Sequence, residues 1–263
     1  MTNNLKKGFT LVELSIVLVI IGLLIGGILV AQSMIGTAKV QALTRQFGSF
    51  DTAVANFQTK FNSALPGDYA AIGDTPGATT DGDGDGDGII EDTAGVLLAF
   101  SGEIGTFWNA LSLTGFSTDG QGTGGTKYVQ HQAVGALVNS GTTANVPKPK
   151  AGSSRGAVVA WGTAGANYYT LASTANMPAA ATPWTATTAG NGALKPADGL
   201  ALDTKMDDGI ANTGSVRASA VLATGIDDAT LASCSTGAPW VVATLTEDCN
   251  VRVRMGLSTG MNN

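Results

Sequence analysis

Residues 81–92 have types and spacing that suit a metal ion: Asp-Gly-Asp-Gly-Asp-Gly-Asp-Gly-Ile-Ile-Glu-Asp. Ca²⁺ takes about six to eight oxygen ligands from a backbone that curls closely around it. The alternating aspartates supply carboxylate oxygens, and the glycines between them permit the curl. Because like charges this close repel one another, an ordered run needs a counterion. The run therefore favours calcium as a cofactor, and the alternative is a solvated acidic loop with no defined ion.

This run contains a register that resembles the opening of an EF-hand calcium loop, D-x-D-x-D-G-x-I. In this register Ile89 offers its carbonyl oxygen and Ile90 packs inward. Position twelve is Ala94, where an EF-hand places a bidentate glutamate, so another acidic residue must complete the shell. Besides Glu91, the candidates for that place are Asp92 and Glu103. The predicted ligand set is Asp83, Asp85, Asp87, Ile89 and Glu91.

A second acidic group, formed by Asp203, Asp207 and Asp208, has two interpretations. It is either another ion site or the end of a helix followed by a turn. Glycine and asparagine follow directly in Gly209 and Asn212, and such residues are typical of helix ends and turns. We favour the second interpretation.

The chain offers little for catalysis. Its sole histidine, His131, has no recognisable partner motif, and the H-E-x-x-H and P-loop patterns do not occur. A membrane-tethered hydrolase with a carboxylate pair is a distant alternative that no motif supports. The sequence predicts a protein that is not an enzyme.

An isolated carboxylate near the N-terminus, Glu13, stands at the edge of a long apolar stretch. Residues 14–31 carry no charge, and Ser15 is their only polar side chain. About 18 such residues are enough for a membrane-spanning helix. Lys6 and Lys7 precede the stretch and favour a cytoplasmic N-terminus. Because a carboxylate at the edge of a bilayer core is costly unless it is paired, Glu13 marks a function.

The order of basic leader, Gly8, Phe9, Glu13 and apolar helix resembles the processing site of type IV prepilins and type II secretion pseudopilins. Ordinary secretory signals are cut after the apolar stretch, whereas here the glycine precedes it. The resemblance implies cleavage between Gly8 and Phe9 by a prepilin peptidase and N-methylation of Phe9. It also implies that Glu13 pairs with the Phe9 amine of a neighbouring subunit. The alternative is a membrane anchor whose glutamate reaches the interface.

The elements that position these residues follow from the apolar pattern. Beyond Ala31, apolar residues recur at helical spacing as far as Phe61, so one helix is expected from Phe9 to about Phe61. Leu65-Pro66-Gly67-Asp68 ends it. The apolar residues after Ala31 are Ile35, Ala38, Ala42, Phe47, Phe50, Val54, Phe57 and Phe61.

The remaining chain alternates short strand-like runs with turn residues, and one short helix is expected over 96–111. Val251, Val253 and Met255 alternate with two arginines, as in a half-buried strand. The fold class is therefore α+β, with a long N-terminal helix packed on an antiparallel sheet and long loops at 140–154 and 173–196. The expected strands are 128–138, 157–161, 168–172, 216–222, 240–245 and 251–255.

The predicted organisation is a leader (1–8), a membrane and assembly half of the helix (9–31), an amphipathic half (32–62) and a globular head (63–263). Cys234 and Cys249, the only cysteines, are expected to form a disulfide in an exported head, as many pilins do near the C-terminus. The alternative is two reduced thiols that do not touch.

The formal net charge is −6, and it becomes −8 once the leader with its two lysines is removed. Such an acidic chain has no electrostatic footprint for nucleic acid, so no nucleic-acid partner is expected.

The resemblance implies a structural subunit of a type IV pilus or related filament. Its expected partners are copies of itself or other pilins in a helical filament, the prepilin peptidase, and the inner membrane before assembly. The precursor would sit in the inner membrane with a periplasmic head, and the mature form in a pilus or pseudopilus, including at the cell surface. Two alternatives are a type II secretion pseudopilin and a calcium-binding periplasmic domain tethered by one uncleaved helix.

Overall fold

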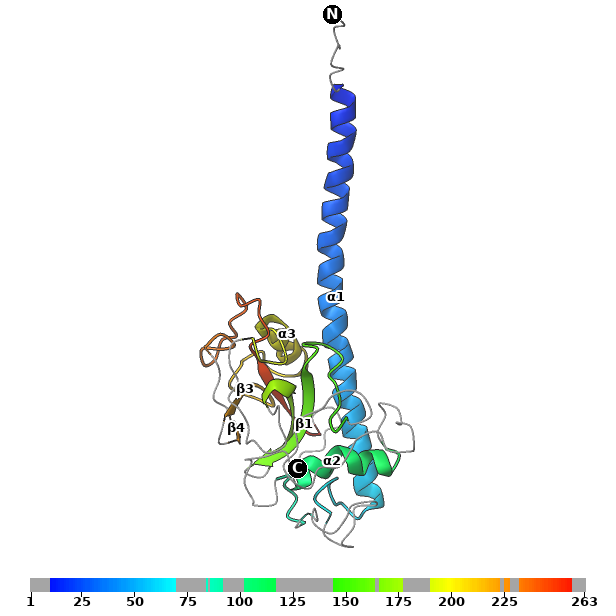
Figure 1. Ribbon diagram of the computed structural model, residues 1–263, viewed down its shortest axis with the longest axis vertical. Coiled ribbons are helices and arrows are strands. Elements are labelled where there is room, and N and C mark those ends of the chain that lie inside the picture. Colours follow the sequence, from blue (N-terminus) through cyan, green and yellow to red (C-terminus); the bar gives the residue numbers. More distant parts are fainter. Residues whose placement is uncertain are drawn as a thin grey trace, which may run out of the picture. The chain divides into compact units, whose positions relative to one another are not determined.

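The computed structural model describes residues 10–69, 84, 86–91, 102–116, 144–163, 166–176, 190–222, 225–227 and 232–256 (Figure 1). By contacts the chain divides into two compact units, Met1–Lys39 and Val40–Asn263. The first unit holds the start of the long helix, and the second holds the end of that helix and the sheet. The domain limits at 8, 31 and 62 stay predictions.

The long helix α1 runs without a break from Leu11 to Lys60, as the apolar pattern predicted. At about 1.5 Å per residue, its 50 residues extend for about 75 Å. Its end is a left-handed turn: Asn62 has a φ of 55°, and the Ser63 amide donates to the Gln58 carbonyl at 2.8 Å. This six-to-one hydrogen bond satisfies a carbonyl that the helix leaves open.

The second unit is built around an antiparallel sheet with strand order β1-β2-β5-β3-β4. The strands β1 (Gly156–Thr163) and β2 (Ala166–Ser173) form a hairpin in which Trp161 pairs with Tyr168. β5 (Asn250–Arg254) lies between β2 and β3 (Val216–Leu222), and the short β4 (Gly225–Asp227) pairs with β3 at the edge. The predicted α+β class with an antiparallel sheet is confirmed.

Among the described residues, two further α-helices and a short 3-10 helix, η1 (Thr174–Asn176), accompany the sheet. α2 (Gly102–Leu113) contacts β1, and α3 (Pro196–Met206) contacts β3. α2 contains the second half of the short helix expected over 96–111, whereas its first half lies outside the described residues. The strand expected over 128–138 also lies outside them.

Aromatic side chains form the centre of the core. From α1, Phe47 and Phe50 reach Tyr169 of β2, with ring centroids 5.9 and 5.7 Å apart. Phe50 also meets Trp108 of α2, at 4.6 Å between centroids. Phe47, Trp108 and Tyr169 are fully or almost fully buried. Burying each such ring is favourable by roughly 1.5–3 kcal/mol, so this cluster ties the end of α1 to the sheet.

One strand prediction is wrong, and a second predicted strand is present with a different pattern of burial. Residues 240–245 do not form a strand: Trp240 makes only an isolated bridge with Ser235, and a turn follows. The Val241 amide donates to the Cys234 carbonyl at 2.9 Å and the Thr244 amide to the Val241 carbonyl at 3.1 Å. In β5 one of the two arginines of the alternation is shielded from solvent, whereas Arg254 is half-buried. Arg252 is buried, and its guanidinium lies 4.6 Å from the centroid of the Tyr168 ring. This cation–π contact takes the place of the solvent contact that the alternating pattern predicted for Arg252.

Candidate functional site

The first turn of α1 places Glu13 against Thr10. The Thr10 amide and the Thr10 hydroxyl each donate to Glu13 Oε2 at 2.8 Å, and the Glu13 amide donates to Thr10 Oγ1 at 3.2 Å. This reciprocal pattern is a capping box, which satisfies backbone donors at a helix start. Glu13 thus has a role within its own chain that the sequence analysis missed, although the Thr-x-x-Glu spacing signals it. Gly8 and Phe9 lie outside the described residues.

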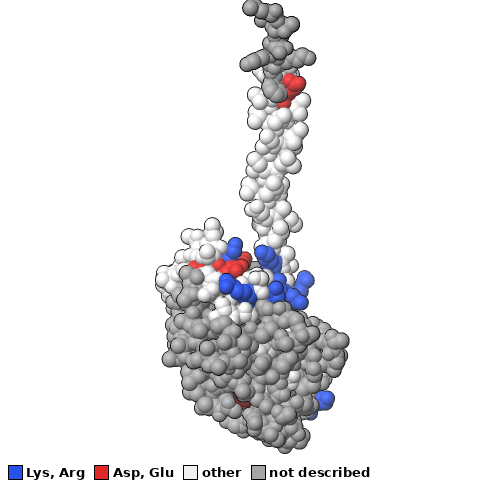
Figure 2. Space-filling view, in the orientation of Figure 1, with Lys and Arg blue, Asp and Glu red and all other residues white. Residues whose placement is uncertain are grey.

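The helix that follows exposes its apolar side chains. α1 is the one helix in the described part of the chain that is long and apolar enough to cross a membrane, by length and composition. None of its most apolar 18-residue window is buried within the chain. Figure 2 shows this part of α1 as a surface without charge. A folded protein rarely leaves so large an apolar surface in water, so lipid or other protein must cover it.

Two glycines in this stretch have open space around them. A Cβ atom built on Gly22 or Gly26 would meet nothing within 4 Å. Each glycine weakens the helix by roughly 1 kcal/mol in water relative to alanine, and packing inside this chain does not require either one. Their spacing permits a close approach of a second helix in an apolar environment.

The described part of the acidic run is held by a carboxylate from elsewhere. Asp68 accepts the Gly86 amide through Oδ1 at 2.7 Å and the Gly88 amide through Oδ2 at 2.8 Å. Asp68 is buried, and so is the Leu65-Pro66-Gly67 segment before it. The sequence of this segment predicts only the end of a helix. The backbone of the loop therefore curls around an acceptor that lies outside the predicted ligand set.

The next residues are fixed from the sheet and from α2. The side-chain amide of Asn167 accepts from the Ile90 amide at 2.9 Å and donates to the Gly88 carbonyl at 2.8 Å. The Ile90 carbonyl accepts from the Gly162 amide at 2.6 Å. The Glu91 amide donates to Glu103 Oε2 at 3.0 Å. Ile90 is fully buried, which confirms that it packs inward.

The structure describes three of the five predicted calcium ligands, and among the described residues their carboxylates do not belong to a close group of three or more acidic side chains. Asp87, Ile89 and Glu91 follow one another in the described loop, and Asp87 Oδ1 accepts the Ile89 amide at 2.7 Å. Asp83 and Asp85 lie outside the described residues. Glu103, a candidate to complete the shell, accepts the backbone amide of Glu91. The ligand set stays a prediction.

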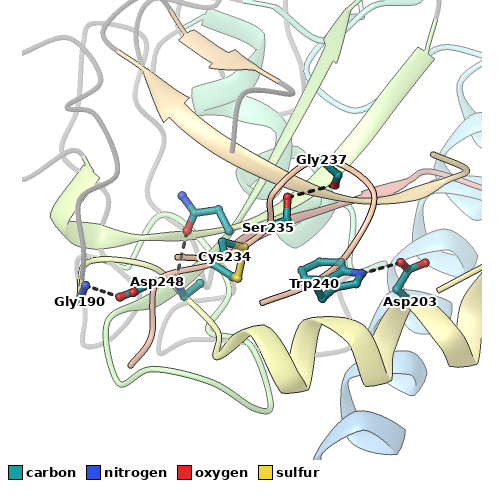
Figure 3. Close-up of a disulfide and its surroundings, with 10 residues drawn as sticks. Gly190, Asp203, Cys234, Ser235, Gly237, Trp240 and Asp248 are labelled. Carbon is teal, nitrogen blue, oxygen red and sulfur yellow. Dashed lines mark hydrogen bonds between the residues drawn. A yellow bond between two sulfur atoms is a disulfide. The ribbon is translucent and has the colours of Figure 1, made fainter. Parts of the chain in front are cut away.

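The two cysteines form the predicted disulfide. Cys234 and Cys249 are bonded, with their Cα atoms 5.1 Å apart (Figure 3). On one side, Asp248 accepts the Gly190 amide. On the other, the Trp240 indole donates to Asp203 Oδ2 at 3.0 Å. The disulfide loop is thereby connected to α3, a contact that no sequence pattern indicated.

The second acidic group lies where the helix-end interpretation placed it. α3 ends at Met206, and Asp207 and Asp208 open the turn that follows. The Thr213 hydroxyl and the Ile210 amide donate to Asp208 and lower its pKa. Burial raises the pKa of Asp203, the Trp240 indole and the Gly209 amide lower it, and the charges of Asp208 and Asp207 raise it again, with a net rise.

Comparisons with known proteins give one match. Residues 3–29 match the family model described as the prokaryotic N-terminal methylation motif, the signature of type IV pilin and pseudopilin precursors. The matched range contains Gly8, Phe9, Glu13 and most of the apolar stretch. The chain thus carries an N-terminus of the type IV pilin or pseudopilin precursor kind, which suggests a structural subunit. No curated protein and no solved structure matches the chain.

Proposed function

We propose that the chain is a structural subunit of a type IV pilus or a related filament, cut between Gly8 and Phe9 and assembled through α1. The observation that supports this best is the methylation motif at 3–29, which continues from Leu11 onward on a helix with exposed apolar side chains. The precursor would hold this helix in the inner membrane. In the filament, the same side chains would pack against copies of themselves or against other pilins.

Cleavage would create a new charge at the start of α1. The Phe9 amine would lie directly before Thr10, and a cation at a helix N-terminus opposes the helix dipole. Glu13, in the first turn, supplies the compensating negative charge. In the low-dielectric filament core, both charges need a partner. Pairing the Phe9 amine of one subunit with Glu13 of the next would satisfy both and fix the register between neighbours.

The capping box permits a sharp test of this pairing. Glutamine occupies the same capping-box position as glutamate, so Glu13→Gln keeps the hydrogen bond to Thr10 and removes only the charge. We expect the variant to insert in the membrane and to be cleaved. Breaking a buried pair costs about 3–5 kcal/mol, so filament yield should fall by more than about tenfold. Filaments sheared from cells and quantified by immunoblot measure the yield.

Thr10→Ala is the matched control. It removes the hydroxyl that caps the helix, at a cost of about 1 kcal/mol, but it keeps the glutamate charge. We expect near wild-type filament yield from this variant. Wild-type yield from Glu13→Gln together with a loss in Thr10→Ala would mean that Glu13 serves only the helix cap, and the proposed pairing would be wrong.

A pilus subunit and a secretion pseudopilin share the features described so far, and we propose the pilus. The long loops expected at 140–154 and 173–196 suit a subunit whose head meets the cell exterior. Deleting the gene should remove a sheared extracellular filament and leave protein secretion intact. Loss of secretion without loss of a surface filament would favour the pseudopilin.

We also propose that calcium binds the acidic loop. The described residues support this in part: Asp87, Ile89 and Glu91 follow in order, and Glu103 adds a carboxylate beside Glu91. Bound calcium would neutralise these carboxylates and stiffen the loop that Asp68 and Asn167 already orient. The Asp87→Asn variant in the titration described below tests this site.

The N-terminal residue of the chain from intact cells separates a filament subunit from a tethered calcium-binding domain. We expect mass spectrometry to find a chain that begins with N-methylated Phe9. A chain that retains residues 1–8, in cells with an active prepilin peptidase, would instead indicate a head held by one uncleaved helix.

A further inference from the structure

Three carboxylates meet at the C-terminal end of α3. Asp203, Asp207 and Asp208 each offer an oxygen, and these oxygens all lie within 4.8 Å of one another. The end of a helix carries the negative pole of its dipole, so acidic residues are unfavourable there and cations are favourable. The last turn of α3 has one basic residue, Lys205. Three acidic side chains at this place create a strongly negative site on the second unit.

Asp203 distinguishes this group from an ordinary acidic turn. Its side chain is fully buried, and Oδ2 accepts the Trp240 indole (Figure 3). The other oxygen, Oδ1, is also buried and makes no hydrogen bond within the described part of the chain. A buried carboxylate oxygen without a hydrogen bond is costly, because it has lost its water. A cation coordinated by this oxygen would remove that cost.

The other two carboxylates are oriented by the turn. Asp207 Oδ2 accepts the Ser215 amide, and also the Val216 amide at 3.1 Å. Asp208 accepts the Ile210 amide at 2.8 Å and the Thr213 hydroxyl at 2.6 Å. A carboxylate has about four lone-pair sites, so these bonds leave acceptor capacity on both residues. Both residues also reach solvent, which gives an ion a path of entry.

We propose that Asp203, Asp207 and Asp208 bind a calcium ion, with water completing the shell. Calcium–oxygen distances are about 2.3–2.6 Å, so two oxygens on opposite sides of the ion lie up to about 5 Å apart. The spacing of the three oxygens fits within that limit. Magnesium, at about 2.0–2.1 Å, would need them within about 4.2 Å and in octahedral geometry. The bound ion would fasten the end of α3 to the disulfide loop through Asp203 and Trp240.

The test titrates the full-length chain in detergent with calcium, and with terbium as a luminescent probe for oxygen-rich calcium sites. The Trp240 indole is hydrogen-bonded to Asp203, so excitation of tryptophan should sensitise emission from terbium bound at this site. Calcium should displace the terbium and remove this emission, whereas magnesium should do so poorly. Asp207→Asn and Asp208→Asn should each weaken calcium binding at this site at least tenfold by calorimetry. Asp208 is exposed, so its replacement is the variant least able to disturb folding.

Two controls separate this site from other acidic groups. Asp198→Asn lies in the first turn of the same helix and should leave binding unchanged. Asp87→Asn removes a predicted ligand of the acidic loop and should not affect the ion at α3. If Asp207→Asn and Asp208→Asn both bind calcium as the wild type does, the proposal is overturned. The proposal is overturned equally if Asp87→Asn alone abolishes all calcium binding by the chain. If Asp87→Asn leaves total calcium binding unchanged, the separate proposal of a site in the acidic loop is wrong, and the site at α3 is unaffected.

Discussion

Single polar side chains hold distant segments of this protein together. Asp68 binds amides 18 and 20 residues further along the chain, and Asn167 binds a segment more than 70 residues before it. The sequence showed that residues 65–68 end a helix and that residues 81–92 are acidic. It could not show that the two meet, because hydrogen bonds across such separations leave no local spacing to recognise.

Glu13, by contrast, is a residue whose role a local sequence pattern can indicate. Its place in a short motif was enough to predict an unusual role, and the Thr10–Glu13 capping box was also visible in the sequence as Thr-x-x-Glu. Local chemistry of this kind can be predicted. The Asp203–Trp240 bond cannot, since it joins a helix to a disulfide loop 37 residues away.

Tyr169 should make the head sensitive to alkali. Burial, followed by the negative charge of Asp51, raises the pKa of Tyr169 well above its ordinary value. Above about pH 10 the unfolded chain loses this proton while the folded chain keeps it. The free energy of unfolding should then fall by about 1.4 kcal/mol per pH unit from this residue. The stability that the folded head gains from the raised pKa of Tyr169 is fully present below about pH 10 and decreases above it. Urea unfolding of the full chain from pH 8 to 11 measures the slope.

Tyr169→Phe is the control for this effect, because it keeps the ring contacts with Phe47 and Trp108. Other tyrosines and the lysines titrate equally in both proteins, so only the difference between the two slopes counts. Parallel slopes would show that Tyr169 ionises in the folded head, against the direction given by its burial.

At the scale of elements, sequence patterns predicted β1, β2, β3 and β5, missed the short edge strand β4, and failed for a segment that does not join the sheet. Residues 240–245 have strand-like composition, but the loop closed by the disulfide bends them into turns and leaves Val242 and Leu245 exposed. Composition records a preference for extended backbone without recording whether a partner strand is present. Arg252 shows the same limit, since its burial depends on Tyr168 of the neighbouring strand.

Trp240 packs on α3 at a glycine, and this contact should be intolerant of a methyl group. A Cβ atom at Gly199 would lie 2.5 Å from the Trp240 ring. In an open helix, alanine is better than glycine by about 1 kcal/mol. Here the clash should reverse that gain, and Gly199→Ala should destabilise the head by about 1–3 kcal/mol. Urea unfolding followed by tryptophan fluorescence measures the change.

Gly36→Ala provides the comparison with opposite sign. Gly36 lies in α1, and a Cβ there meets nothing within 4 Å, so helix propensity alone should act. We expect no loss of stability from this substitution. A stabilised Gly199→Ala variant would mean that Trp240 moves aside freely, and the connection between α3 and the disulfide loop would then be weak.

At the scale of the whole molecule, the two units differ in where their apolar side chains lie. In the first, apolar side chains are exposed, and hydropathy along the sequence was sufficient to predict that helix. In the second, apolar side chains form a closed core, and the order of strands depends on contacts between residues far apart in the chain. The fold class could therefore be predicted, whereas the strand order β1-β2-β5-β3-β4 could not.

That strand order has a consequence for the timing of folding. β5 follows the other described strands in the chain, yet it lies between β2 and β3 and pairs with both. Until β5 has been synthesised, the hairpin of β1 and β2 has no neighbour through which to join β3. Pairings that wait for a late segment form slowly, because the intervening chain must first be closed into a loop. The described sheet of a nascent chain would therefore remain incompletely paired until β5 is available.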